Sequence, residues 1–117
     1  MNAEKRKSDL QFNFVMDEKN IPEQINWEAS DGSNNGVQKA KAMMIALWDE
    51  QQRNGLSIDL WTKEMTIEEM NVFFYQTFLT MSDSFLRATR NKEASEEIKA
   101  FAKKFFEGLQ KPTVNPL

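Results

Sequence analysis

The chain has 117 residues, 40% of them hydrophobic and 28% charged, which suits one globular domain. It has no cysteine and no histidine, which excludes thiol nucleophiles, histidine acid–base catalysis, disulfide scaffolds and the usual zinc and haem sites. The net charge of −3, with no strongly basic segment, argues against nucleic acid as a partner. Apolar runs are too short for a signal peptide or a membrane span, so we expect a cytoplasmic protein that does not insert into a membrane.

Two segments near the N-terminus alternate apolar with polar residues. Residues 10–16 and 25–29 each follow a period of two, which predicts two half-buried strands. Residues 17–22 between them supply turn chemistry and end in a proline, so the simplest interpretation is an antiparallel hairpin.

Residues 31–36 form a polar loop that partly resembles an EF-hand calcium loop. Ala42 stands where that loop needs its bidentate glutamate, so we expect a turn with Asn35 as a helix cap rather than a calcium site. Apolar residues at helical spacing then predict a helix from Val37 to Trp48, ended by Asn54 and Gly55. Residues 56–61 alternate again and predict a third strand.

The clearest local pattern is the capping box of Thr66 and Glu69, which predicts a helix to about Thr89. Asn91 or Ser95 caps a last helix. We expect Gly108 and Pro112 to end that helix. The predicted fold is α+β, in the order β-β-α-β-α-α, with three helices on one face of a small three-stranded antiparallel sheet. We expect a single domain over residues 9–110, with flexible ends at 1–8 and 111–117.

Acidic pairs such as Glu68 and Glu69 are adjacent on a helix, so they do not share a face and fit the helix dipole better than acid–base catalysis. The sequence has no glycine-rich phosphate loop and no recognisable nucleophile motif. We therefore predict no enzyme activity, no cofactor and no metal site.

Trp61 is the most informative single residue, because its parity puts it on the polar face of its own strand. Tryptophan is enriched at the centres of protein interfaces, which predicts a partner-binding surface there; the alternative is that Trp61 folds over the strand edge or against the first predicted helix. The residues predicted to form this surface are Trp61, Asp59, Thr62, Lys63, Asn26 and Glu28.

Several stretches of the sequence resemble the gliding motility protein GldC family of gliding bacteria. The most distinctive stretch is Ile58-Asp59-Leu60-Trp61-Thr62-Lys63-Glu64-Met65, and the others are Ile25-Asn26-Trp27-Glu28-Ala29-Ser30-Asp31, Lys41-Ala42-Met43, Trp48-Asp49 and Glu69-Met70. The likeness runs from about residue 8 to residue 105. Glu28 and Glu64 stand where the family usually has aspartate, which is a conservative difference.

The resemblance implies a small soluble cytoplasmic protein that supports gliding and has no known catalytic activity. In the family the gene often lies beside that of a gliding lipoprotein, which implies action near the cell envelope. We therefore expect a protein partner, either a component of the gliding machinery or a lipoprotein-associated complex. Two alternatives stay open: a module that binds an apolar ligand between sheet and helices, and an acidic homodimeric chaperone.

Overall fold

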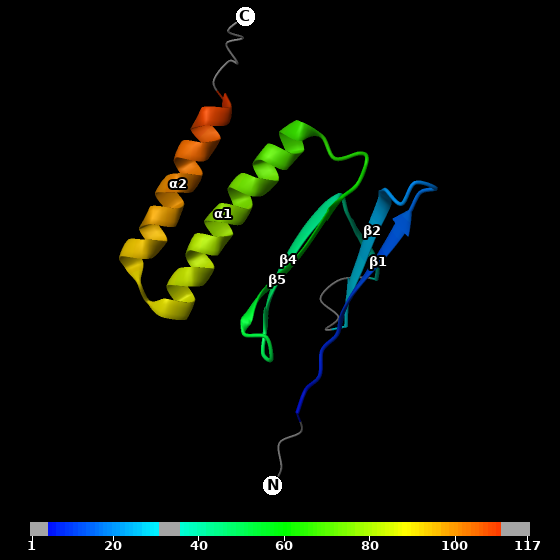
Figure 1. Ribbon diagram of the computed structural model, residues 1–117, viewed down its shortest axis with the longest axis horizontal. Helices are drawn as coiled ribbons and strands as arrows, with labels where there is room; N and C mark the ends of the chain where they lie inside the picture. Colours follow the sequence, from blue (N-terminus) through cyan, green and yellow to red (C-terminus); the bar gives the residue numbers. More distant parts are fainter. Residues whose placement is uncertain (1–4, 31–35, 111–117) are drawn as a thin grey trace, which may run out of the picture. The chain divides into compact units, whose positions relative to one another are not determined.

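The computed structural model describes residues 5–30 and 36–110, which contain five strands followed by two helices (Figure 1). The elements are β1 (Leu10–Met16), β2 (Pro22–Ala29), β3 (Gln38–Ala40), β4 (Ala42–Asp49), β5 (Asn54–Trp61), α1 (Ile67–Thr89) and α2 (Lys92–Gln110). The strands belong to a compact unit that ends at Met65, and the helices belong to a second unit that begins at Thr66.

The predicted N-terminal hairpin is confirmed. β1 pairs antiparallel with β2, and β3 adds to the other side of β2, so the sheet order is β1-β2-β3. One face is apolar, with Phe12 opposite Trp27 and Phe14 opposite Ile25, while the other face is mostly polar. Ile25 has no exposed surface and forms the centre of this sheet's apolar face.

The predicted helix after residue 36 is wrong, because this segment forms β3 and β4. Residues 42–48 form one continuous apolar run, so both faces of a strand are apolar there and a helical spacing is satisfied as well. The predicted helix end at Asn54 and Gly55 is instead the start of β5. A tight turn precedes it, in which the Arg53 N–H donates to the Asp49 carbonyl at 2.8 Å and Arg53 has a positive φ of 54°.

The predicted third strand exists as β5, but it pairs with β4 in a separate two-stranded sheet. The prediction of a single three-stranded sheet, with a helix between its second and third strands in the sequence, is therefore wrong. The observed order is β-β-β-β-β-α-α. The two sheets adjoin at Lys41, between β3 and β4. The Lys41 carbonyl accepts hydrogen bonds from the Thr62 N–H at 2.7 Å and from the Thr62 hydroxyl at 3.0 Å.

The α1–α2 hairpin begins as the sequence predicts. Both hydrogen bonds of the capping box between Thr66 and Glu69 are present, and α1 ends at Thr89. Asn91 caps α2 by accepting the Ala94 N–H at 3.0 Å. The described part of α2 runs through Gly108 to Gln110, and Pro112 lies outside the described residues. With residues 37–48 extended, the described chain has two helices rather than the three predicted.

The two helices pack against each other through a pair of small residues and, elsewhere along their length, through aromatic residues. Ser82 and Ser95 are buried against each other, and Phe78 makes edge-to-face contacts with Phe101 and Phe105, at 5.3 Å between ring centroids. The placement of the helices on one face of the sheet and the single domain of residues 9–110 stay predictions. The tail at 111–117, the first four residues of the predicted flexible N-terminus and loop positions 31–35, with the cap at Asn35, lie outside the described residues.

Candidate functional site

Trp61 and Trp48 lie on the same face of the β4–β5 sheet. Trp61 is opposite Ala42 and Trp48 is opposite Gly55, so each indole stands across from a residue with little or no side chain. This face carries Ala42, Met44, Ala46, Trp48, Gly55, Ser57, Asp59 and Trp61, and we call it the Trp48/Trp61 face. Trp61 is 56% exposed and Trp48 is 72% exposed.

Between the two tryptophans the Trp48/Trp61 face has one charged residue, Asp59. Met44, 38% exposed, lies opposite Asp59, whose carboxylate is the charged group of this face. The next pair, Ala46 and Ser57, is small. Ala42, the residue opposite Trp61, is six positions before Trp48 along β4, so the two indoles are anchored about 20 Å apart. Such a face offers two aromatic anchors around one carboxylate.

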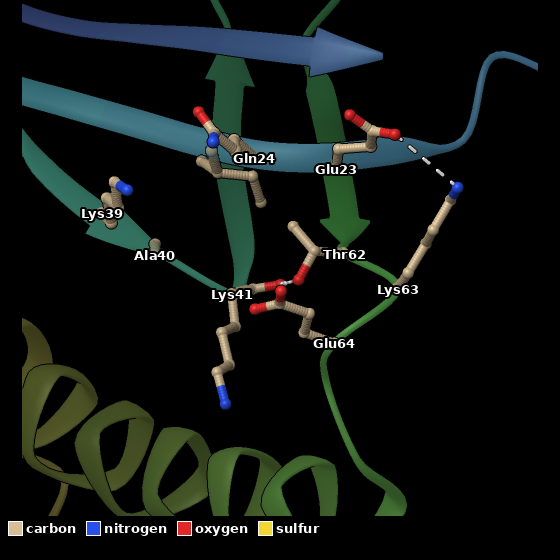
Figure 2. A pocket seen from close by; sticks show the side chains of 9 residues that line it. Glu23, Gln24, Lys39, Ala40, Lys41, Thr62, Lys63 and Glu64 are labelled. Atoms are coloured by element: carbon tan, nitrogen blue, oxygen red, sulfur yellow. Dashed lines mark hydrogen bonds and ion pairs between the residues drawn. The ribbon is translucent and has the colours of Figure 1, made fainter. Parts of the chain in front are cut away.

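Thr62 and Lys63 leave β5 toward the junction of the two sheets and serve the fold there. Thr62 is 3% exposed and is hydrogen-bonded to Lys41, as Figure 2 shows. The Lys63 N–H donates to the Pro22 carbonyl at 3.3 Å, which ties the end of β5 to the start of β2. Thr62 therefore stabilises the junction, and its predicted contact with a partner stays a prediction.

The Lys63 side chain is held by two carboxylates of the neighbouring sheet. Its Nζ lies 2.5 Å from an oxygen of Asp17 and 3.8 Å from one of Glu23; the longer contact is drawn in Figure 2. The hydrogen bond from Lys63 lowers the pKa of Asp17, helped by the N–H of Ile21. The same bond with Asp17 raises the pKa of Lys63.

Asn26 and Glu28 lie on a different sheet from Trp61. They are on β2, opposite Asn13 and Gln11, on the polar face of the three-stranded sheet. The six predicted site residues are thus divided among three places: the Trp48/Trp61 face, the junction and the polar face of the first sheet. The predicted surface does not include Trp48, because residues 37–48 were predicted to form a helix.

A polar hollow of about 500 Å³ lies at the junction (Figure 2). Three lysines and two glutamates contribute to its lining, namely Lys39, Lys41, Lys63, Glu23 and Glu64. The mixed charges favour ion pairing within the protein over a single class of charged ligand. Among the described residues, no group of acidic side chains is arranged to hold a metal ion.

We expect Lys63→Met to lower the Tm of the chain by about 2 °C at neutral pH, because it removes the ion pair with Asp17. Because the pKa of Asp17 is lower in the folded state, its ionised carboxylate stabilises the fold at pH values above the usual pKa of aspartate. This stabilisation is lost as the pH falls through the folded-state pKa of Asp17. Because the pKa of Lys63 is higher in the folded state, its charged form stabilises the fold at pH values below the usual pKa of lysine. This stabilisation is lost as the pH rises through the folded-state pKa of Lys63.

The Tm difference between wild type and Lys63→Met should therefore be largest between about pH 5 and pH 10 and shrink below about pH 4. Thermal melts across this range measure it. The control is Lys19→Met, in the exposed turn of the same hairpin, which should change the Tm little at any pH. A difference that stays constant down to pH 2 would contradict the ion-pair assignment.

A comparison with known protein families shows which family the chain belongs to. A family model described as "Gliding motility-associated protein GldC-like" matches residues 22–111. The chain belongs to this family. The resemblance found in the sequence is confirmed, and the GldC-like match includes both strands of the Trp48/Trp61 face.

Membership of the GldC-like family associates the chain with gliding motility. No curated protein and no solved structure matches the chain significantly. Over residues 5–30 and 36–110, neither helix is long and apolar enough to cross a membrane.

Proposed function

We propose that this GldC-like chain is a non-enzymatic accessory protein of gliding motility that binds another protein on the cytoplasmic side through its Trp48/Trp61 face. The observation that carries the proposal is the exposure of two tryptophans on one face of one sheet, 72% for Trp48 and 56% for Trp61. Family membership supports the association with gliding motility, and the two exposed tryptophans support the proposal that the chain binds a protein.

Burying two exposed indoles of one β-hairpin against a partner would remove a large apolar area from water, which is favourable in free energy. Each tryptophan can bury a large apolar area, and alanine substitution of such an anchor typically costs an interface about 2 kcal/mol or more. Isolated exposed apolar residues are common, but here Met44 lies between the two tryptophans and extends the apolar surface. These three exposed apolar side chains favour a protein partner.

The negative charge of Asp59 on the Trp48/Trp61 face indicates which charge a partner surface would carry. Asp59 lies between the two aromatic anchors and carries an exposed carboxylate. A complementary surface would therefore present two apolar pockets with a lysine or arginine between them. From the gene neighbourhood implied by the family resemblance, we expect this partner among the envelope-associated components of the gliding machinery.

The titratable groups at the junction fit this non-catalytic role. The pKa shifts of Asp17 and Lys63 arise from the ion pair between these two residues, and Lys63 also ties the two sheets together through its backbone. Such a shift has a structural cause and does not prepare either group for proton transfer.

The test compares proteins captured from the lysate of a gliding bacterium by three immobilised chains. We expect wild type and Leu47→Ala to capture the same protein, and the double variant Trp48→Ala, Trp61→Ala to lose it. Leu47 is the matched control, because it is 55% exposed and adjacent to Trp48 but lies on the opposite face of β4. With the purified partner, losing one anchor should raise the Kd by about thirtyfold.

Circular dichroism and thermal melts of the three chains establish that each is folded. Equal capture by the double variant and wild type would remove the Trp48/Trp61 face as the binding surface. Loss of capture by Leu47→Ala alone would move the binding surface to the opposite face of the hairpin.

A further inference from the structure

Within the described residues, no strand pairs with the outer edge of β1. β1 lies at the end of the order β1-β2-β3, and within the described residues it pairs with β2 alone. Its sequence, LQFNFVM, has no charged residue and no proline. Proteins usually protect such edges with charges, proline or a covering element, because an open edge pairs readily with another strand.

The hydrogen bonds of the sheet define which β1 groups point outward. The Ser30 N–H donates to the Asp9 carbonyl at 2.9 Å, so these two opposed residues form a hydrogen-bonded pair. Antiparallel strands alternate hydrogen-bonded and non-hydrogen-bonded pairs. The backbone groups of Gln11, Asn13 and Val15 therefore face β2, and those of Leu10, Phe12 and Phe14 face the open edge.

The side chains of β1 repeat about Asn13. Phe12 and Phe14 flank Asn13 at one residue on either side, and Leu10 and Met16 flank it at three residues. All four apolar residues belong to one face of the sheet. The strand therefore carries nearly the same pattern when read from either end, as an antiparallel pairing with itself requires.

We propose that β1 pairs antiparallel with β1 of a second copy of this chain, about a two-fold axis at Asn13. Phe12 of one copy then lies opposite Phe14 of the other, and each of these two pairs exchanges two backbone hydrogen bonds. The apolar faces of the two three-stranded sheets become continuous, with aromatic rings opposed across the new junction.

A second copy fits this edge better than an unrelated extended chain for two reasons. The outward-facing backbone groups of Phe12 and Phe14 are brought into register by the same two-fold axis that opposes their aromatic side chains. The axis also brings no like charges together, because β1 is uncharged.

Cysteine substitution tests this pairing directly, because the natural chain has no cysteine. Asn13 faces its own copy in a non-hydrogen-bonded pair, with the Cα atoms about 4.5 Å apart, which suits a disulfide. We expect Asn13→Cys to form a disulfide-linked dimer under mild oxidation at least about tenfold faster than Gln11→Cys. In the proposed register the two copies of residue 11 lie about 14 Å apart, too far for a disulfide.

Gln11→Cys is a matched control, because residue 11 lies two positions before Asn13 on the same exposed face of β1. A mixture of Gln11→Cys and Val15→Cys should form a disulfide between the two different chains, because the proposed register opposes these two residues. Sedimentation equilibrium of the wild-type chain should give the mass of a dimer.

Three results would each overturn the proposal: a monomeric wild type throughout the concentration range used, equal oxidation rates for Asn13→Cys and Gln11→Cys, or no disulfide in the mixture. The residues tested lie on β1, away from Trp48 and Trp61 on the second sheet, so this pairing and the proposed partner surface can fail independently.

Discussion

Ile25→Ala should lower the Tm of the chain by about 10 °C or more. Ile25 is fully buried on β2 and lies between Phe14 on β1 and Ala40 on β3. Removing a buried isoleucine side chain down to alanine costs about 2–4 kcal/mol, because the lost apolar contacts leave a cavity that the sheet cannot fully close. For a chain of this size, each kcal/mol is worth roughly 4 °C.

Ile21→Ala is the matched control for this prediction. The same atoms are removed from the same hairpin, but Ile21 is 42% exposed in the turn before β2, so its Tm change should be less than half as large. Thermal melts followed by circular dichroism compare the two variants. Equal losses would mean that Ile25 is not the centre of the apolar face.

Ser82→Leu should disrupt the α1–α2 hairpin, with a cost of about 2–5 kcal/mol. The Ser82 hydroxyl lies 2.7 Å from the Ser95 carbonyl, and the Ser95 hydroxyl donates to the Ser82 carbonyl at 2.9 Å. Both side chains are buried where the two helices approach each other. Leucine would force the helices apart and leave the buried Ser95 hydroxyl without its hydroxyl neighbour.

The loss of helix signal with denaturant measures this effect. Ser84→Leu places the same side chain two residues further along α1, on an exposed surface, and should change the unfolding midpoint little. The smaller change Ser82→Ala, combined with Ser95→Ala, should cost less than the sum of the single variants, because the two hydroxyls share their hydrogen bonds. Additive costs would show that the two serines do not act together.

The elements predicted correctly from the sequence are those specified by local chemistry. The alternation of residues 10–16 and the turn chemistry after it define the first hairpin, and the capping box of Thr66 and Glu69 defines the start of α1. In each case a few neighbouring residues contain the whole signal. Gly108 lies inside α2, because a glycine permits a helix to end without requiring it to.

Residues 42–48 show where sequence patterns are ambiguous. An uninterrupted apolar run satisfies the spacing of a helix and the needs of a strand with two apolar faces equally well. Tertiary pairing decides between the two: three apolar cross-strand pairs join β4 to β5, such as Ile45 with Ile58. That pairing connects residues across a turn, and no local propensity reports it.

The same ambiguity explains why the predicted surface combined residues of two different sheets. The position of Trp61 follows from strand parity alone, whatever strand lies beside it. Grouping it with Asn26 and Glu28 required the correct sheet pairing, and those residues belong to the other sheet. The ion pair of Lys63 with Asp17 joins segments distant in sequence, so it could be found only from the structure.

Gliding itself gives the most direct test of the Trp48/Trp61 face. A gliding bacterium lacking its own copy of the gene would receive wild type, Leu47→Ala or the double variant Trp48→Ala, Trp61→Ala, at equal protein levels. We expect wild type and Leu47→Ala to restore gliding speed and the double variant to fail. Full gliding with the double variant would contradict the proposal that this GldC-like protein acts through its two exposed tryptophans.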